Sequence, residues 1–251
     1  VMDYLLTYAD RGFSGNPQDT GNDRTYSLDV LPQEFPCRLT GDFRSPVLDL
    51  VNADGSLGCD LRYQGYEICD GKYNLKGLPA VYAAEEEAQT LIIYMKDQVT
   101  GLQVELLYGV LPEYDVITRS AKVINTEEDK IRLTKAQAAC IDFVHGEFDV
   151  ISFYGRHAME RNMQRTSVGH GAFVIGSRRG TSSHQYNPMM ILAEKETTED
   201  AGTCYGMSFV YSGGFKAEVE KDQFGQTRMQ MGLQEEQFSY PLKKGEEFVI
   251  P

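Results

Sequence analysis

The chain has 251 residues, which is long enough to bury a full hydrophobic core. It carries 24 lysines and arginines against 37 aspartates and glutamates, a formal net charge of −13. Such an acidic balance repels phosphate backbones and anionic lipids, and no apolar run approaches the length of a membrane span. We therefore expect neither nucleic acid nor a membrane as a partner.

The cysteines and histidines predict neither a disulfide framework nor a metal site. Five cysteines are scattered along the chain without a CxxC pair. This odd, dispersed set suits reduced thiols in a cytoplasmic protein, and the apolar runs around Cys140 and Cys204 predict that both are core residues. The four histidines show no HxH or HExxH spacing, so we expect no metal and no cofactor.

The first 46 residues form an irregular, turn-rich segment. Residues 10–17 and 20–24 contain the glycine, proline and asparagine that punctuate loops, and helical periodicity is absent. A long ordered loop in a compact domain usually serves a function. This segment is therefore the first candidate for a functional role.

From Val47 onward the pattern alternates between strands and turns. Residues 52–55 and 70–71 carry turn signals, and within residues 101–108 the apolar Leu102, Val104 and Leu106 alternate with the polar Gln103 and Glu105. Arg119 interrupts the apolar face of the following strand, so it must be paired or lie at an edge. Residues 215–220 alternate in the same way.

Helical stretches are short. Residues 83–88 and 233–237 have room for one or two turns each, without an amphipathic stripe. Many short strands predict a mainly β chain: a large two-sheet antiparallel β-sandwich with few short helices. No linker, repeat or change of composition divides residues 1–251, so we expect a single domain.

A polar stretch at residues 177–188, SRRGTSSHQYNP, precedes an apolar strand. Its many donors and acceptors need partners if they are half-buried. We interpret it as a polar corner that ties sheets together, with a docking face for another domain or a sugar as the alternative.

Candidate catalytic groups are few. Asp142, Glu147 and Asp149 are close in sequence, but an exposed acidic face is the preferred interpretation. No GxSxG elbow and no nucleotide-binding loop is present. Tryptophan, the strongest stacking platform for a sugar ring, is absent, which disfavours an independent lectin site.

Three stretches carry a family resemblance: residues 177–188, residues 205–215 (YGMSFVYSGGF) and residues 218–228 (EVEKDQFGQTR). Together they resemble the N-terminal domain of glycoside hydrolase family 36 α-galactosidases, especially the bacterial branch. The resemblance covers essentially the whole chain. It implies a β-supersandwich of the galactose mutarotase type over residues 1–251, with a catalytic (β/α)8 barrel expected after residue 251.

The same resemblance implies a role without catalytic residues in this chain. In the family both catalytic aspartates belong to the barrel, and the enzyme acts on terminal α-galactosides such as melibiose and raffinose. In tetrameric bacterial members a loop of this domain reaches the active site of a neighbouring subunit. Residues 9–14 (ADRGFS) and 23–29 (DRTYSLD) match that loop. The resemblance therefore implies that Asp10 and Arg24 contact the substrate.

Two other functions stay open from the residues. One is a stand-alone carbohydrate-binding module. The other is a mutarotase-type epimerase, for which His145 and His184 are the candidate bases. One departure is also clear: many family members have a tryptophan in the segment matching residues 155–161, whereas this chain has His157 and Ala158 there.

Overall fold

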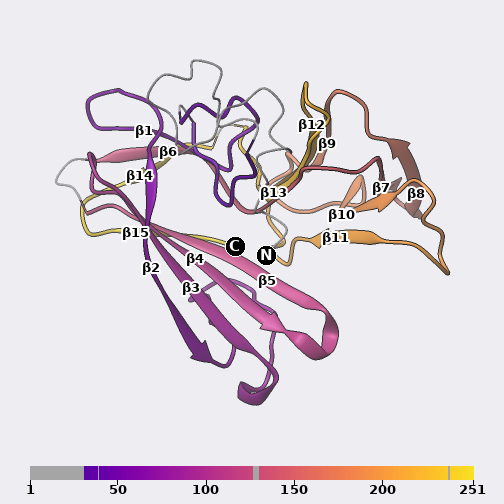
Figure 1. The fold of residues 1–251 in the computed structure, drawn as a ribbon, viewed down its shortest axis with the longest axis horizontal. Coiled ribbons are helices and arrows are strands. Elements are labelled where there is room, and N and C mark those ends of the chain that lie inside the picture. Colours follow the sequence, from indigo (N-terminus) through magenta and orange to yellow (C-terminus); the bar gives the residue numbers. More distant parts are fainter. Residues whose placement is uncertain (1–30, 39, 127–129, 237) are drawn as a thin grey trace.

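The structure is a computed structural model that describes residues 31–38, 40–126, 130–236 and 238–251. These residues form a mainly β architecture, as predicted, with helix only in two short 3₁₀ turns (Figure 1). The elements are β1 (Leu48–Val51), β2 (Leu61–Asp70), η5 (Glu85–Glu87), β3 (Gln89–Asp97), β4 (Gln103–Leu111), η6 (Pro112–Tyr114), β5 (Val116–Ile124), β6 (Ile131–Phe143), β7 (Phe148–Arg156), β8 (Met159–Ser167), β9 (Gly171–Gly176), β10 (Tyr186–Glu194), β11 (Cys204–Ser208), β12 (Phe215–Lys221), β13 (Thr227–Leu233), β14 (Tyr240–Leu242) and β15 (Glu247–Ile250).

Hydrogen bonding divides the described strands into three sheets. The five-stranded sheet has the order β15-β5-β4-β3-β2, and the four-stranded sheet has the order β11-β10-β7-β8. The third sheet, with six strands, runs β1-β6-β13-β12-β9, with β14 also paired to β6. All pairings between named strands are antiparallel, which agrees with the predicted fold class, although the prediction had two sheets.

The strands form three sheets rather than two because β6 spans both halves of the molecule. One buried cluster contains Leu133 and Ala136 of β6 with Val104 and Leu106 of β4. A second cluster, between the six-stranded and four-stranded sheets, takes in the other end of β6 through Ile141. The ladder between β6 and β13 shifts register between Met231 and Gly232, so one strand can serve two cores.

Local chemistry accounts for the turns and the alternation. In the turn after β1, Gly55 has a φ of 87°, a left-handed conformation that favours glycine. The hairpin between β12 and β13 closes on Asp222, whose Oδ1 accepts hydrogen bonds from the backbone N–H groups of Phe224 and Gln226, both at 2.9 Å. In β4, the alternation predicted for residues 101–108 places Val104 and Leu106 in the core.

Two sequence expectations are corrected here. Residues 83–88 contain the single 3₁₀ turn η5, whereas the turn predicted over residues 233–237 is wrong in the described part of the chain: Leu233 ends strand β13, and residues 234–236 are not helical. Cys140 is buried as predicted, but Cys204 is exposed because it begins β11, the edge strand of the four-stranded sheet. In the part of the chain that the structure describes, no helix has the length and apolar character to cross a membrane.

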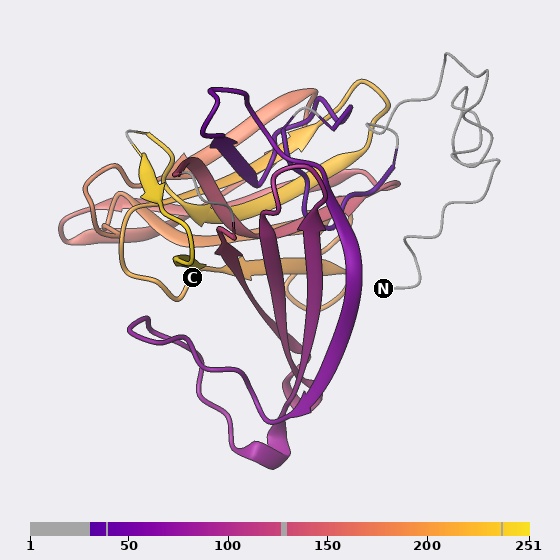
Figure 2. The same cartoon turned by 90° about the vertical axis from the view of Figure 1, so that its left-hand side faces the viewer.

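The five-stranded sheet projects from the rest of the molecule. Strands β2 to β5 run away from the other two sheets, and the short helix η5 lies at their far tip (Figures 1 and 2). The polypeptide that enters the described region at Leu31 instead passes over the six-stranded sheet, where the candidate site lies.

Candidate functional site beneath the N-terminal segment

The two residues predicted to contact substrate, Asp10 and Arg24, lie outside the described residues, so their predicted roles stay predictions. The chain that follows them is described from Leu31. Residues 31–38 and 40–47 take part in a cluster of buried charges at the six-stranded sheet. This buried cluster consists of Asp42, Arg44, Asp142 and Arg228, all of which are at most 6% exposed.

Arg228 of β13 is the centre of the buried cluster. Its Nε and Nη2 donate to both carboxylate oxygens of Asp142 on β6, at 2.7 and 2.8 Å. Nη2 also lies 2.7 Å from Oδ2 of Asp42, and Nη1 donates to the backbone carbonyl of Ser45 at 3.0 Å. Two strands and the entering segment are therefore joined through one guanidinium, whose planar fork suits bidentate carboxylate pairing.

Arg44 connects the buried cluster to the start of the described chain. It forms a bidentate pair with Asp42, with its Nε 2.9 Å from Oδ1 and its Nη2 3.0 Å from Oδ2. Nη2 also donates to the carbonyl oxygen of Leu31 at 2.6 Å. The backbone N–H of Gln33 donates to Oδ2 of Asp142 at 2.9 Å. The buried cluster thus holds the backbone close to where residues 1–30 end.

The contacts within the cluster favour the charged forms of Asp42 and Arg228. Burial acts to raise the pKa of Asp42, but hydrogen bonds and charge from Arg44 and Arg228 bring that pKa below its ordinary value. Burial also opposes the charge of Arg228, and the hydrogen bond to Asp142 nevertheless raises its pKa above the ordinary value. Two arginines facing two aspartates leave the cluster balanced in charge, which is the condition for burying ions in a protein interior.

A second anchor holds the same segment on the five-stranded sheet. Glu34 accepts hydrogen bonds from the Tyr108 hydroxyl of β4 and from Nη1 of Arg119 of β5. The Arg119 guanidinium carbon also lies 4.0 Å from the centroid of the Tyr108 ring. Of the two outcomes predicted for Arg119, a partner or an edge position, the structure shows a partner, which comes from the segment that follows Asp10 and Arg24 in the chain.

The acidic residues singled out in the sequence are separated by the fold. Asp142 belongs to the buried cluster, and Asp149 is buried beneath Arg165 and Lys195, each 2.7 Å from one of its carboxylate oxygens. Only Glu147 is exposed, and it pairs with Lys221 at 2.9 Å. The interpretation of an exposed acidic face is therefore wrong for Asp142 and Asp149, because both strands are covered on the side that carries them.

Residues 177–188 act as a corner between sheets. The Ser177 backbone N–H donates to the carbonyl of Phe215 at 2.9 Å, and the Ser182 N–H donates to that of Ser212 at 2.8 Å. The Gly155 N–H donates to the carbonyl of Gln185 at 3.1 Å. These bonds connect the stretch to the ends of β7 and β12, and they support the interpretation as a tie between sheets.

The candidate bases for an epimerase do not lie on a sheet. His145 is exposed on the connection between β6 and β7, and His184 is exposed on the polar corner. An epimerase site needs a histidine and a carboxylate converging on one concave surface. The described structure therefore gives that alternative no support.

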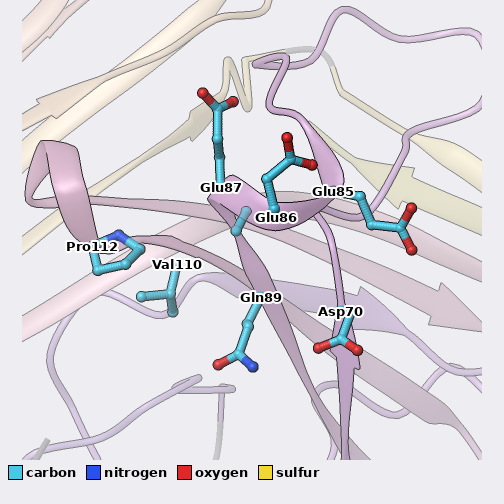
Figure 3. A pocket seen from close by; sticks show the side chains of 8 residues that line it. Asp70, Glu85, Glu86, Glu87, Gln89, Val110 and Pro112 are labelled. Carbon is cyan, nitrogen blue, oxygen red and sulfur yellow. The ribbon is translucent and has the colours of Figure 1, made fainter.

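An acidic pocket of about 600 Å³ lies at the tip of the five-stranded sheet. It is lined by Asp70 and the three glutamates of η5, together with Gln89, Val110 and Pro112. Figure 3 shows the Glu85 and Glu87 carboxylates pointing in different directions, and Glu87 Oε2 accepts a hydrogen bond from the Ala84 backbone at 2.7 Å. In line with this divergence, no group of three potential ligands suited to a metal occurs among the described residues.

Sequence reasoning missed most of the buried cluster. Asp42 and Arg44 belong to the irregular early segment, and Arg228 lies at the end of a longer motif. One signal was present: Arg228 stands beside Met229 in a strand-like run, as Arg119 stands among apolar residues. A charged side chain in such a run needs a buried partner, but the partners lie 86 and 186 positions away.

Comparison with known proteins gives the family. A family model described as the glycosyl hydrolase family 36 N-terminal domain matches residues 6–243. The chain is 63% identical over 250 residues to the bifunctional α-galactosidase/sucrose kinase AgaSK of Mediterraneibacter gnavus, covering 100% of this chain and 27% of that protein. It is 44% identical over 243 residues to α-galactosidase Mel36A of Lactobacillus acidophilus, covering 96% of this chain and 33% of that protein.

Solved structures agree with these matches. The galactosidase domain of AgaSK aligns with a TM-score of 0.94 at 62% identity, over 100% of this chain and 35% of that chain. A variant of α-galactosidase AgaA from Geobacillus stearothermophilus, in complex with stachyose, aligns with a TM-score of 0.92 at 42% identity, over 98% and 34% of the respective chains. The chain thus spans about a third or less of the length of the curated relatives named above. By sequence and by fold, it belongs to the N-terminal domain family of glycosyl hydrolase family 36.

Proposed function

We propose that this chain is the non-catalytic N-terminal domain of a cytoplasmic α-galactosidase that hydrolyses terminal α-galactosides of the melibiose and raffinose type. The observation that carries the proposal is the family match over residues 6–243. In this proposal a catalytic barrel of the same polypeptide supplies the nucleophile and the acid/base. The domain supports the barrel, takes part in a homo-tetramer and contributes a loop to the galactoside pocket of a neighbouring subunit.

The electrostatics of the described carboxyl groups support a non-catalytic role. A retaining glycosidase needs an acid/base whose pKa is raised, about 5–5.5 Å from a nucleophile. Among the described carboxyl groups, every one whose pKa is shifted has it lowered. They are Asp42, Asp54, Asp97, Glu147, Asp149 and Glu235. Such groups stay ionised at neutral pH and are poor proton donors.

The proposed pocket loop gives Asp10 and Arg24 complementary tasks. A carboxylate accepts hydrogen bonds from sugar hydroxyls, and a guanidinium donates in a rigid fork. The buried cluster and the pairing of Glu34 with Arg119 support this arrangement because both fix the polypeptide shortly after Arg24. A loop anchored close to its end loses less conformational entropy when it meets the substrate.

The cytoplasmic location rests on the thiols. All five cysteines are free, and a protein exported to an oxidising compartment would more commonly pair them. The contacts of the chain do not favour a stand-alone carbohydrate-binding module or an epimerase, so we propose neither.

The roles of Asp10 and Arg24 are tested by kinetics of the full-length enzyme. Asp10→Ala and Arg24→Ala should each lower kcat/KM for raffinose about 10- to 100-fold, because each removes a charged hydrogen bond to the substrate. Asp200→Ala and Arg132→Ala, at exposed positions of the described region, are the matched controls and should retain wild-type kinetics. Wild-type kcat/KM in both loop variants would contradict the assigned roles.

A further inference from the structure

One face of the five-stranded sheet is largely apolar, interrupted by Arg119 and, at the tip, by Asp70 and Gln89. The register aligns Tyr66 of β2 with Ile93 of β3, and Ile93 with Leu106 of β4. One step outward, Ile68 aligns with Leu91. Directly opposed residues in a sheet share a face, so these side chains belong to one continuous surface.

The inner half of this surface is the core, whereas the outer half is largely exposed except where Glu34 pairs with Tyr108 and Arg119. Val104 and Leu106 on the inner half are completely buried. The outer half consists of Tyr66, Ile68, Leu91, Val110 and Ile117, which we call the outer face. Tyr66, Ile68 and Ile117 are 63%, 61% and 62% exposed, respectively. Exposed apolar side chains gathered on one face of a sheet mark an interaction site rather than a solvated face.

The opposite side of the same sheet is covered around β4. Leu107 of β4, which points away from the outer face, is only 2% exposed. The connection after β2 lies over that side: the Tyr73 N–H donates to the Thr90 hydroxyl at 2.9 Å, and a side chain at Gly109 would meet Lys72 and Tyr73. On the side of the outer face, the described chain places Glu34 on Tyr108 and Arg119 but leaves Tyr66, Ile68 and Ile117 exposed.

The edge strand β15, next to the outer face, indicates which polypeptide covers that face. Strand β15 pairs with β5 only from Glu247, opposite Ile124, to Ile250, opposite Ala121. Ile250 also accepts a hydrogen bond from the Ser120 hydroxyl at 2.6 Å. Because the pairing is antiparallel, polypeptide continuing along this ladder would next pass Arg119 and Ile117. Among the described strands, none pairs with that part of β5 on the β15 side.

Charges around the outer face define the chemistry of its partner. Asp70 and the η5 glutamates line the pocket at the sheet tip, and Val110 belongs to both this pocket and the outer face. A complementary surface is therefore apolar at its centre and basic at its rim.

We propose that the outer face is an intramolecular docking surface for the part of the same α-galactosidase chain that follows Pro251, which enters beside β5 as an extension of β15. This inference rests on the function proposed above, since it takes its occupant from the remainder of the parent enzyme. The docked segment buries Ile68 and Ile117 and places basic side chains opposite the η5 glutamates. In this way the five-stranded sheet positions the catalytic part relative to the six-stranded sheet, which holds the described chain from Leu31 onward.

Burial of the outer face is measured by thiol labelling of the full-length enzyme. Ile117→Cys should react with a maleimide at least about 100-fold more slowly than Val99→Cys, because a docked surface must open before it reacts. Val99 is the matched control, since it is a β-branched residue that is 92% exposed on the turn between β3 and β4. Mass spectrometry of peptides separates these positions from the five native cysteines of this domain. Equal rates at both positions would overturn the proposal.

The occupant is identified by photo-crosslinking from the outer face. A benzoylphenylalanine at position 66 replaces Tyr66 in a mixture of isotopically heavy and light full-length chains. Capture of a peptide beyond Pro251 within one chain is the expected result. A crosslink between a heavy and a light chain would overturn the proposal, because the occupant would then be a second copy. A crosslink to residues 1–30 would also overturn it, because the occupant would then be the N-terminal segment. Raffinose hydrolysis by the wild-type enzyme is measured in parallel, so a failure of the proposed activity is recognised separately from a failure of docking.

Discussion

At the scale of single residues, the charged side chains that matter are those the fold has buried in pairs. Arg228 is completely buried between two aspartates, whereas Arg178 of the polar corner pairs with Glu236 in an exposed position. The two arginines have the same chemistry and opposite environments. Their contribution to stability should differ accordingly, because exposed pairs are screened by water and buried ones are not.

Replacing Arg228 should strongly destabilise the domain. In Arg228→Met the carboxylates of Asp42 and Asp142 stay buried with only one cation, so we expect a loss of about 3–5 kcal/mol in the free energy of unfolding. Arg178→Met is the matched control and should change it by less than about 1 kcal/mol. Urea unfolding followed by tyrosine fluorescence measures both, since the chain has no tryptophan. Equal midpoints for the two variants would contradict the role of the buried cluster.

The lowered pKa of Asp149 predicts how the stability of the fold depends on pH. Burial acts to raise its pKa, but hydrogen bonds from Lys195, Arg165 and Ser167 lower it to about 2, from 3.8 for the free side chain. A carboxyl whose folded pKa is depressed stabilises the fold above its unfolded pKa and loses that contribution as pH falls through the folded value. The wild type should therefore lose stability between about pH 4 and pH 2 more steeply than Asp149→Asn.

Thermal unfolding at a series of pH values measures this difference. Asp149→Asn should have a lower midpoint than the wild type at pH 7, because Arg165 and Lys195 lose their counter-charge. The two midpoints should converge as the pH approaches 2. Parallel curves down to pH 2 would show that Asp149 does not carry the predicted linkage.

At the scale of elements, strand β6 decides how the sheets are arranged. It supplies apolar residues to both cores because its ladder with β13 changes register beside Gly232. A Cβ atom at Gly232 would lie 2.4 Å from the Gln137 Cα atom, which real contacts do not allow. The glycine therefore permits the close approach of the two strands at the bulge.

Gly232→Ala should test this packing directly. Because the clash is with backbone, the ladder must shift, and we expect the free energy of unfolding to fall by about 1–3 kcal/mol. Gly65→Ala is the matched control: Gly65 also lies in a bulged strand, but a Cβ atom added there would have no neighbour within 4 Å. That variant should be neutral or slightly stabilising, because alanine restricts the unfolded chain. A loss of similar size in both variants would point to a general cost of side chains at strand glycines.

At the scale of the whole molecule, the proposed tetramer predicts that two defective subunits can help each other. A chain with Asp10→Ala retains an active barrel, and a chain whose barrel nucleophile is removed retains an intact loop. If the loop serves a neighbouring subunit, co-expression of the two should restore raffinose hydrolysis well above the sum of the separate variants. Activity equal to that sum would show that each loop serves its own subunit.

Much of the architecture was determined by the sequence alone. The alternation in residues 101–108, the turn glycines and the isolated Arg119 are local patterns, and local patterns depend on the pleat and on backbone sterics. They sufficed for a mainly β antiparallel fold and for the need of Arg119 to find a partner. The family resemblance also lay in contiguous motifs, so it was readable without coordinates.

Only the tertiary structure decided which charges are buried and which apolar residues are exposed. Arg228 meets Asp42 across 186 positions, and no local rule joins two residues so far apart. Alternation also does not say whether a strand is covered on one side or on both, which is why Asp142 and Asp149 are buried and Cys204 is exposed. Those outcomes depend on how the sheets stack, since burial is a property of the neighbouring sheet rather than of the strand itself.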